Sequence, residues 1–434
     1  MSALEKAAKK FDKRWAPLLA AGAGAASLGA TSPGATSAAP GARLVSPAAA
    51  ELCARSLLAD AAPLVALSAR VAELTESLPP PVRAGGGGGT ARPSLGVGGA
   101  PLAEASAPLV KSLDILSLPV DAISYVRVRM AKGPLDEPIA VPVLVARGAH
   151  AGPVLGITST LHGNELAGIP VIHRLFAELD TSTLCGTVVA VPVVNPIGFL
   201  RYTRGFSDGA DLNRIMPGKK GGSASQSFAF ALMTRLIAHV DFLLDLHTAS
   251  FGRVNSVYVR ADMNEPHAHR LALLQAPQII VHNTGPDGSM RGACAALGKP
   301  AITIEIGDPQ VIDAARTEKA LQGIRNTLAH LKMSRAFDVA LDDSLPVVCS
   351  RSFWMFSKAG GILTVKPAVT AWVRKGEVIA EIHSIWGALI DTVPSPADGI
   401  VVGKSTNPVC QSGDRILHIG VVEDSFSSVA DDGH

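Results

Sequence analysis

The sequence predicts an α/β fold followed by a small β-rich domain. Between Leu113 and about His330, short apolar runs alternate with segments of helical periodicity, which is typical of helices packed on a sheet. From Val347 to Val422 the chain changes to short strands separated by turns such as Lys375-Gly376. The expected organisation is a low-complexity segment over 1–105, an α/β domain over 106–340, a barrel-like β domain over 341–424 and a tail over 425–434.

The elements of the α/β domain follow from the spacing of their apolar residues. Short runs rich in Val and Ile predict strands at 139–146, 153–161, 186–194, 240–246, 256–259 and 300–306. Longer segments predict helices at 166–179, 223–240 and 313–332. Because strands and helices alternate, we expect the strands to form one sheet that is covered by helices.

The first 105 residues are rich in Ala, Gly, Ser and Pro, and Pro79-Pro80-Pro81 and Gly85 to Gly89 mark linkers. An a/d spacing of apolar residues predicts a helix over 64–78. It could dock on the α/β domain or pair with a second copy in a homo-oligomer, but two heptads are short and a local surface helix is the alternative. Lysines and an arginine before Trp15 could begin a signal or transit peptide. Otherwise this segment is a tail, and we expect a cytoplasmic protein.

The composition argues against several classes of function. With 39 basic and 37 acidic residues, a net charge of +2 and no Lys/Arg run, a nucleic-acid partner has little support. The chain lacks a stretch of about eighteen strongly apolar residues, so no membrane span is expected. Its five cysteines are scattered without a C-x-x-C pair, which indicates a reducing compartment and no thiolate metal site.

Two segments carry residue types that bind a catalytic zinc. His162 and Glu165 stand in His162-Gly163-Asn164-Glu165, between a predicted strand and a predicted helix, and His247 ends another predicted strand. Residues that follow neighbouring strands of an α/β sheet can converge at its edge. A catalytic zinc takes three protein ligands and leaves one position open for water. The H-x-x-E pair is weak by itself, because such a pair on a surface helix is usually solvated.

Two further features support hydrolytic chemistry. Arg204 and Asp211-Leu-Asn213-Arg214 lie in a glycine-rich loop, where a guanidinium beside an amide suits a substrate carboxylate. Glu305 is a single carboxylate in an apolar strand, and its unpaired burial would cost several kcal/mol. A general base beside a metal-bound water would explain its presence.

These motifs resemble those of the succinylglutamate desuccinylase/aspartoacylase family, which is related to zinc carboxypeptidases. The resemblance runs from about 120 to 422 and also includes Asn195-Pro196 and Asp245-Leu-His247-Thr248. It implies a carboxypeptidase-like α/β/α sandwich with a mixed sheet and a small C-terminal all-β domain. It also implies one zinc ion per chain, held by His162, Glu165 and His247.

The resemblance implies roles for five further residues. Asn213 and Arg214 would hold the substrate carboxylate, and Asp211 would orient a zinc-bound imidazole. Arg204 would polarise or bind the acyl part, and Arg291 would also face the substrate. Which of these two arginines stabilises the oxyanion stays open.

The chain departs from related patterns at two places. Some family members add a C-terminal tyrosine to the substrate site, whereas Tyr125, Tyr202 and Tyr258 all precede the β domain. The acyl group and the amino acid of the substrate therefore stay open. The β domain resembles biotinyl and lipoyl domains, but the carrier position in His383-Ser-Ile-Trp-Gly-Ala388 has no lysine. We therefore expect a wall or gate over the cleft.

Other candidate residues have ordinary explanations. His267 and His269 are expected to be a solvated pair, His173 a helix residue and Cys294 a small packing residue, while His282 could line the cleft.

The sequence therefore predicts a metal-dependent amidohydrolase, a deacylase acting on the linear amide of an N-acyl amino acid or a related small molecule. Metal-activated water would attack the amide while Glu305 carries the proton. One alternative is a zinc carboxypeptidase acting on peptides, against which the small β domain argues because it should narrow the cleft. The other alternative is a non-catalytic binding protein that keeps the fold.

Overall fold

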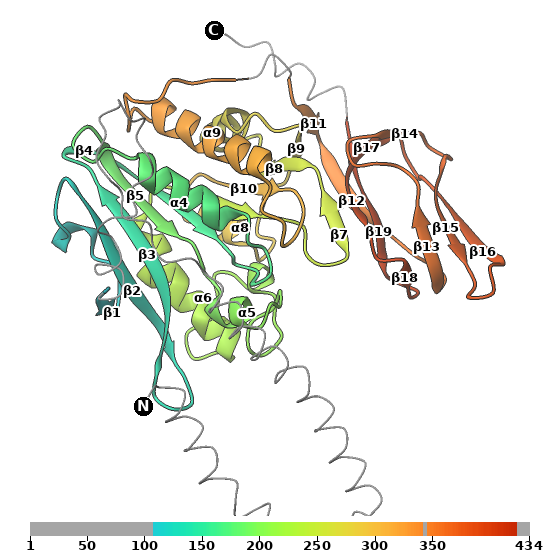
Figure 1. Ribbon diagram of the computed structural model, residues 1–434, viewed down its shortest axis with the longest axis horizontal. Coiled ribbons are helices and arrows are strands. Elements are labelled where there is room, and N and C mark those ends of the chain that lie inside the picture. Colours follow the sequence, from blue (N-terminus) through green and yellow to red (C-terminus); the bar gives the residue numbers. More distant parts are fainter. Residues whose placement is uncertain (1–106, 342–344, 423–434) are drawn as a thin grey trace, which may run out of the picture. The chain divides into compact units, whose positions relative to one another are not determined.

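The computed structural model describes residues 107–341 and 345–422. They belong to one compact unit of the chain, Val97–His434 (Figure 1). The predicted linkers, the helix over 64–78, the targeting segment and the tail over 425–434 lie outside the described residues. Within the described part, none of the helices has the length and apolar character that a bilayer crossing requires.

A mixed sheet of ten strands forms the centre of the described α/β part. In spatial order its strands are β1 (Leu109–Val110), β2 (Ala122–Lys132), β3 (Pro138–Arg147), β5 (Cys185–Val191), β4 (His150–Ser159), β6 (Phe242–His247), β10 (Ala301–Ile306), β8 (Val257–Ala261), β9 (Ile279–His282) and β11 (Val347–Cys349). The central strands β5, β4, β6 and β10 run parallel, whereas β3 and β8 flank them antiparallel. The predicted mixed α/β sheet is confirmed.

Helices cover both faces of this sheet (Figure 1). On one face, α4 (Gly168–Glu178), α7 (Pro266–Leu274) and α9 (Ala314–His330) share a hydrophobic core with the strands. On the other face, α6 (Ala224–Arg235) and α8 (Met290–Ala296) contribute to a second core. Because a sheet with two apolar faces must bury both, this arrangement accounts for the continuous apolar runs of the central strands.

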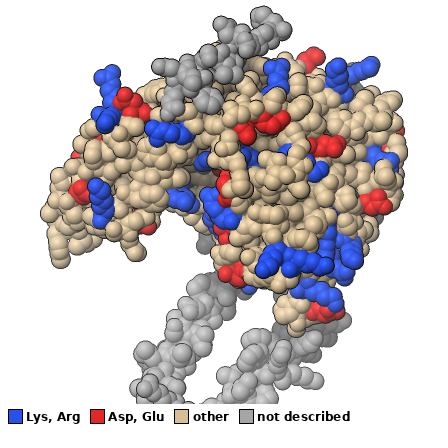
Figure 2. Space-filling model, turned by 180° about the vertical axis from the view of Figure 1, so that it is seen from behind, with Lys and Arg blue, Asp and Glu red and all other residues tan. Residues whose placement is uncertain are grey.

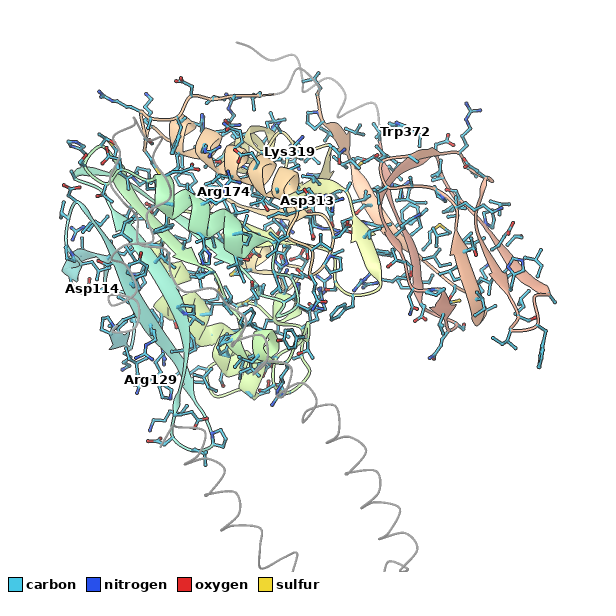
Figure 3. All side chains as sticks on the ribbon, viewed as in Figure 1. Asp114, Arg129, Arg174, Asp313, Lys319 and Trp372 are labelled. Atoms are coloured by element: carbon cyan, nitrogen blue, oxygen red, sulfur yellow. The ribbon has the colours of Figure 1, made fainter. Side chains whose placement is uncertain are left out.

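Local signals set the ends of the helices. Ser223 and Gln226 form a capping box at the start of α6, and the carboxylate of Asp313 accepts a backbone N–H at the start of α9 (Figure 3). The sequence places the end of the first of these helices near 240, but α6 ends at Arg235. Leu236 leaves the helical backbone region, with φ −127° and ψ −64°, so the chain turns early toward β6.

The C-terminal part consists of two antiparallel sheets. One contains β12 (Arg351–Phe356), β19 (Arg415–Val421), β17 (Gly399–Ser405) and β14 (Trp372–Val373); the other contains β16 (Leu389–Pro394), β15 (Val378–His383), β13 (Gly361–Val365) and β18 (Val409–Cys410). They share a core that includes Leu363, Ile379 and Ile419. The expected short antiparallel strands are present, but the pairing order of the described strands does not close them into a barrel.

A short strand joins the two parts. β7 (Arg253–Asn255) comes from the α/β region but pairs antiparallel with β17 of the C-terminal sheet, so that Asn255 lies opposite Gly403. Residues i and i+2 of a strand point to the same side. β7 therefore presents Arg253 and Asn255 on one side of the strand, and both line the cavity described below.

Candidate active site

Three predicted metal ligands converge where two parallel strands end. His162 and Glu165 stand in the turn between β4 and α4, and His247 is the last residue of β6, which pairs with β4. All three side chains are buried. Glu165 Oε1 lies 2.9 Å from His162 Nδ1, and its Oε2 lies 2.9 Å from His247 Nδ1. One nitrogen or oxygen from each residue falls within 4.8 Å of the others, a spacing that could hold a metal ion.

The turn that carries two of these residues needs its glycine. A Cβ atom at Gly163 would lie 1.9 Å from the carbonyl carbon of Gly198, which belongs to α5 (Pro196–Leu200). The backbone of α5 therefore packs directly on the turn. A larger residue at 163 would displace this turn, and with it His162 and Glu165.

A carboxylate lies behind each imidazole. His162 Nε2 is 3.0 Å from Asp211 Oδ1, and His247 Nε2 is 2.8 Å from Asp245 Oδ2. With Nε2–H donating to a carboxylate, the Nδ1 lone pair of each ring is directed at the centre of the cluster, as metal-binding histidines require. Although burial alone would lower the pKa of His247, Asp245 and Glu165 raise it well above its ordinary value. The cluster therefore favours positive charge at its centre, which fits a divalent cation.

Asp211, which the resemblance implies would orient an imidazole, thus lies against His162, whereas the partner role of Asp245 was not predicted. The signal was present in the sequence. Asp245 and His247 are two residues apart on a strand, so their side chains point to the same side. Thr158 fixes Asp245 from the neighbouring strand, because its hydroxyl donates to Asp245 Oδ1 at 2.7 Å.

Arg204 lies at the rim of the ligand cluster. Its Nη1 donates to Glu165 Oε1 at 2.8 Å and to Ser250 Oγ at 2.7 Å, and its Nη2 donates to Asp211 Oδ2 at 2.9 Å. Its positive charge is therefore centred beside the three ligands.

Arg291 also lines the cavity, but its guanidinium is held by the protein. It is buried on α8 and donates to Asn283 O at 2.8 Å, to Asn283 Oδ1 at 2.6 Å and to Asp287 Oδ2 at 2.9 Å. Of the two arginines left open by the sequence, Arg204 is the one next to the ligand cluster.

Asn213 and Arg214 lie on a 3-10 turn, Leu212–Arg214, at the wall of the cavity. The Asn213 Oδ1 accepts the backbone N–H of Met290 at 2.8 Å, which ties this turn to the start of α8. A Cβ at Gly288 would lie 2.3 Å from the Arg214 carbonyl oxygen, so the two loops are in direct contact. These contacts fix the backbone from which Arg214 enters the cavity.

Glu305 stands near the end of β10, in register with His247 on the adjacent parallel strand. Its carboxylate lies 3.2 Å from Asn255 Nδ2 and 3.3 Å from the Tyr258 hydroxyl, and both groups donate to it. Burial raises the pKa of Glu305; His247 offsets this only in part, and Glu165 reinforces it. A raised pKa brings a carboxylate toward the range in which it can exchange protons near neutral pH.

Sequence reasoning did not single out Asn255, Tyr258 or Arg260 as site residues. Arg260 Nη2 donates to the Tyr258 hydroxyl at 3.1 Å, and this hydroxyl donates to Glu305. Arg260 and Tyr258 therefore form a chain of hydrogen bonds that ends on Glu305. Tyr258 and Arg260 alternate on β8, which pairs with the Glu305 strand. Polar residues at alternate positions of an apolar strand were a usable signal.

The remaining candidates lie outside this cluster. His267 is on the helix α7, as is His269, and Cys294 is a buried residue of α8 within the second core. His282 Nδ1 accepts the backbone N–H of Met263 at 3.0 Å, and His282 is not among the residues that line the cavity.

The cavity has a volume of about 450 Å³ and takes side chains from both parts of the described chain. The α/β part supplies the ligand cluster, and the C-terminal sheets supply Trp354 and Phe356 of β12 and Arg415 and His418 of β19. In the space-filling view, Lys and Arg side chains gather beside a hollow in the face of the molecule (Figure 2).

The fold and this cluster define an α/β protein with a buried His-Glu-His site at the carboxyl ends of central strands of a mixed sheet. Residues 151–331 match the succinylglutamate desuccinylase/aspartoacylase catalytic domain. This region of the chain is therefore similar to the catalytic domain of that family.

Individual relatives agree with this assignment. The chain is 25% identical over 303 residues to the N-alpha-acetyl-L-2,4-diaminobutyric acid deacetylase of Halomonas elongata, which covers 66% of this chain and 87% of that protein. The fold of this chain is similar to that of the product-bound ectoine utilization protein EutE from Ruegeria pomeroyi, with a TM-score of 0.63. The two sequences are 21% identical, and the match covers 70% of this chain and 98% of the EutE chain. A succinylglutamate desuccinylase/aspartoacylase from Rhodobacter sphaeroides gives a TM-score of 0.63 and 19% identity over 72% and 100%.

Proposed function

We propose that the protein is a zinc-dependent hydrolase that cleaves the amide bond of an N-acylated amino acid or a related small molecule. The observation that carries this proposal is the position of Glu305, buried and in register with His247, beside a cluster of three potential metal ligands. The family of residues 151–331 and the deacetylase name of the Halomonas relative support the same reaction class.

The donor set suits zinc. Two imidazole nitrogens and one carboxylate are a common ligand set of catalytic zinc sites, and the carboxylates of Asp211 and Asp245 behind the rings provide the expected outer support. A zinc ion held there would lower the pKa of a bound water to about 7 and polarise the substrate carbonyl.

The remaining steps belong to residues of the chain. Glu305 takes a proton from the attacking water and returns it to the leaving amine, a transfer that contributes about 10² to 10⁴-fold to the rate. Arg204, already beside Glu165, stabilises the negative charge that develops on the carbonyl oxygen. Asn213 and Arg214 bind the carboxylate of the amino acid and so fix the scissile bond against the base.

The size of the cavity favours a small substrate over a peptide. Residues of β12 and β19 line it together with those of the α/β part, and its volume of about 450 Å³ suits a molecule the size of an acyl amino acid. A zinc carboxypeptidase would need the same ligands and base, so substrate comparison has to separate the two reactions.

The test uses purified, zinc-loaded full-length protein. We expect about one zinc per chain, loss of activity on chelation, and hydrolysis of N-acetyl, N-succinyl or N-formyl amino acids in preference to a panel of short peptides. His247→Ala should lose both zinc and activity, while the matched control His269→Ala, outside the cluster, should keep both. Preference for peptides would favour a carboxypeptidase, and bound zinc without any hydrolysis would favour a binding protein.

A further inference from the structure

The carboxylate of Glu305 is supported by a buried tyrosine and a half-buried arginine on the neighbouring strand. Tyr258 lies directly opposite Glu305 in the antiparallel pairing of β8 with β10, and Arg260 stands two residues further along β8. Residues i and i+2 of a strand point to the same side, so both side chains reach the side on which Glu305 stands. The guanidinium carbon of Arg260 lies 5.3 Å from the centre of the Tyr258 ring.

The donor and acceptor roles in this chain of groups follow from the chemistry of arginine. A guanidinium has five N–H donors and no acceptor. At the 3.1 Å contact with Arg260 Nη2, the Tyr258 hydroxyl oxygen therefore has to accept. Its single hydrogen is then left for the 3.3 Å contact with Glu305 Oε1. Arg260 thus fixes Tyr258 as a donor toward Glu305.

The phenol of Tyr258 also keeps its proton. Burial and the negative charge of Glu305 raise the pKa of Tyr258 above its ordinary value, and Arg260 offsets this rise only in part. The ring of His418, whose centre lies 6.2 Å from that of Tyr258, is neutral because burial and nearby arginines lower its pKa well below the ordinary value. Tyr258 therefore remains a hydrogen-bond donor at neutral pH.

The two oxygens of Glu305 are held from different strands. Oε1 accepts from Tyr258 of β8, and Oε2 accepts from Asn255 Nδ2 of β7 at 3.2 Å. Rotation of the carboxylate about its terminal bond would break both hydrogen bonds. Each carboxylate oxygen has two lone pairs, so one on each oxygen stays free to take a proton.

Packing alone does not explain the polar residues of β8. Val259 and Ala261 belong to the first hydrophobic core, whereas Tyr258 and Arg260 line the cavity. A phenylalanine at 258 would fill the same space without a hydroxyl, whose burial costs free energy unless it is hydrogen-bonded. The contacts that this hydroxyl makes are those with Arg260 and Glu305.

We propose that Arg260 and Tyr258 are positioning residues, which hold Glu305 in one orientation and direct its proton toward the substrate. This inference rests on the proposed function and deepens it by naming the residues that control the general base. An O–H bond of the attacking water breaks as Glu305 takes the proton, and the same proton then forms an N–H bond with the leaving amine. Because the hydroxyl hydrogen of Tyr258 already lies between the two oxygens, protonated Glu305 cannot pass its proton to that side.

Steady-state kinetics of the zinc-loaded full-length protein test the positioning role. Tyr258→Phe removes the hydroxyl and keeps the ring. It should lower kcat on the best N-acyl amino acid by about 10- to 100-fold, the loss expected for a hydrogen bond to a charged group, with KM and zinc content unchanged. Tyr202→Phe, which removes an exposed hydroxyl, is the matched control and should keep the wild-type kcat. An unchanged kcat of Tyr258→Phe, or a loss that appears mainly in KM, would overturn the proposal.

A double-mutant cycle determines whether Arg260 acts through Tyr258. The amide oxygen of a glutamine can accept a hydrogen bond, so Arg260→Gln lets the Tyr258 hydroxyl turn away from Glu305 and should lower kcat as much as Tyr258→Phe does. Combined with Tyr258→Phe, it should add little further loss. Arg260→Lys, which has donors and no acceptor, should restore most of kcat. If Arg260→Gln does not fold, Arg260→Met takes its place in the cycle. Losses that add in the double variant would refute action through Tyr258.

A measurement without hydrolysis separates this inference from the proposed function. The chain has three tyrosines, Tyr125, Tyr202 and Tyr258, whose ionisation is followed by ultraviolet absorbance in an alkaline titration, while circular dichroism confirms that the fold persists. Tyr258→Phe identifies the transition that belongs to Tyr258. Glu305→Ala removes the acceptor and its negative charge, so it should lower the pKa of Tyr258. That shift in a protein that hydrolyses nothing would contradict the proposed function and retain the hydrogen-bond chain, whereas an unchanged titration would overturn the chain even in an active deacylase.

Discussion

The contact between β7 and β17 places a glycine of the C-terminal sheet, Gly403, opposite Asn255, which donates a hydrogen bond to Glu305. A Cβ at Gly403 would lie 2.3 Å from Asn255 Oδ1 and 3.0 Å from the backbone oxygen of Val254. The backbone oxygen is held in the strand pair, so the overlap is relieved most easily by rotation of the Asn255 amide. That rotation removes the 3.2 Å hydrogen bond from Asn255 Nδ2 to Glu305.

The magnitude follows from the hydrogen bond that is lost. A hydrogen bond to a charged group contributes about 1.5 to 3 kcal/mol, which corresponds to about 10- to 100-fold in rate if it orients the base in the transition state. Gly403→Ala should therefore lower kcat by about this factor, with KM and zinc content near those of the wild type. Asn255→Ala, which removes the donor directly, should produce the same loss.

The assay measures kcat, KM, zinc content and thermal unfolding on the best N-acyl amino acid. Gly399→Ala is the matched control, because Gly399 lies on the same strand as Gly403. Its Cβ would meet the backbone oxygen of Gly420 at 2.5 Å and lies away from Asn255. Gly399→Ala should lower the thermal stability of the protein but lower kcat less than Gly403→Ala does. The reasoning fails if Gly403→Ala keeps the wild-type kcat, or loses no more of it than Gly399→Ala.

Further outcomes follow from the site. Glu305→Gln should lower kcat by about 10² or more with zinc retained, and a near wild-type kcat would remove the base from the scheme. Arg214→Ala should act mainly through KM in steady-state kinetics. Asp245→Asn should weaken zinc binding about 10- to 100-fold in competition with a chelator. Because folding lowers the pKa of His418, the unfolded chain binds its proton first. Stability should fall by up to about 1.4 kcal/mol per pH unit below 6.5, and urea unfolding of His418→Phe should lack this component.

The sequence predicts the residues of the site that stand at or just after the ends of strands. His162, Glu165 and His247 stand at the ends of β4 and β6, and the alternation of strands and helices is enough to bring such ends to one edge. Glu305 follows from the same logic, because β10 is the next parallel strand. For these residues the local strand pattern and the fold agree, so their position in the site can be predicted from the sequence.

The other wall of the cavity depends on pairing that no local pattern reports. Asn255 meets Gly403 and Arg253 meets Ser405, pairs separated by about 150 positions along the chain. A strand of three residues is too short for its periodicity to be recognised in the sequence. No residue near Arg253 indicates that β7 will pair with β17. From the sequence, the C-terminal part was expected to form a wall or gate over the cleft.

The structure gives that part a more specific role. Through β7 it holds Asn255 against Glu305, and through β12 and β19 it places Trp354 and Arg415 in the cavity. The residues proposed to carry out hydrolysis stand at the carboxyl ends of β4, β6 and β10, whereas Trp354 and Arg415 lie on the C-terminal sheet. Because β7 carries both Asn255 and Arg253, a change in its pairing should displace both side chains. Asn255→Ala should therefore lower kcat only, whereas Gly403→Val, which is too large for rotation of the Asn255 amide to relieve the overlap, should also displace β7 and lower kcat further.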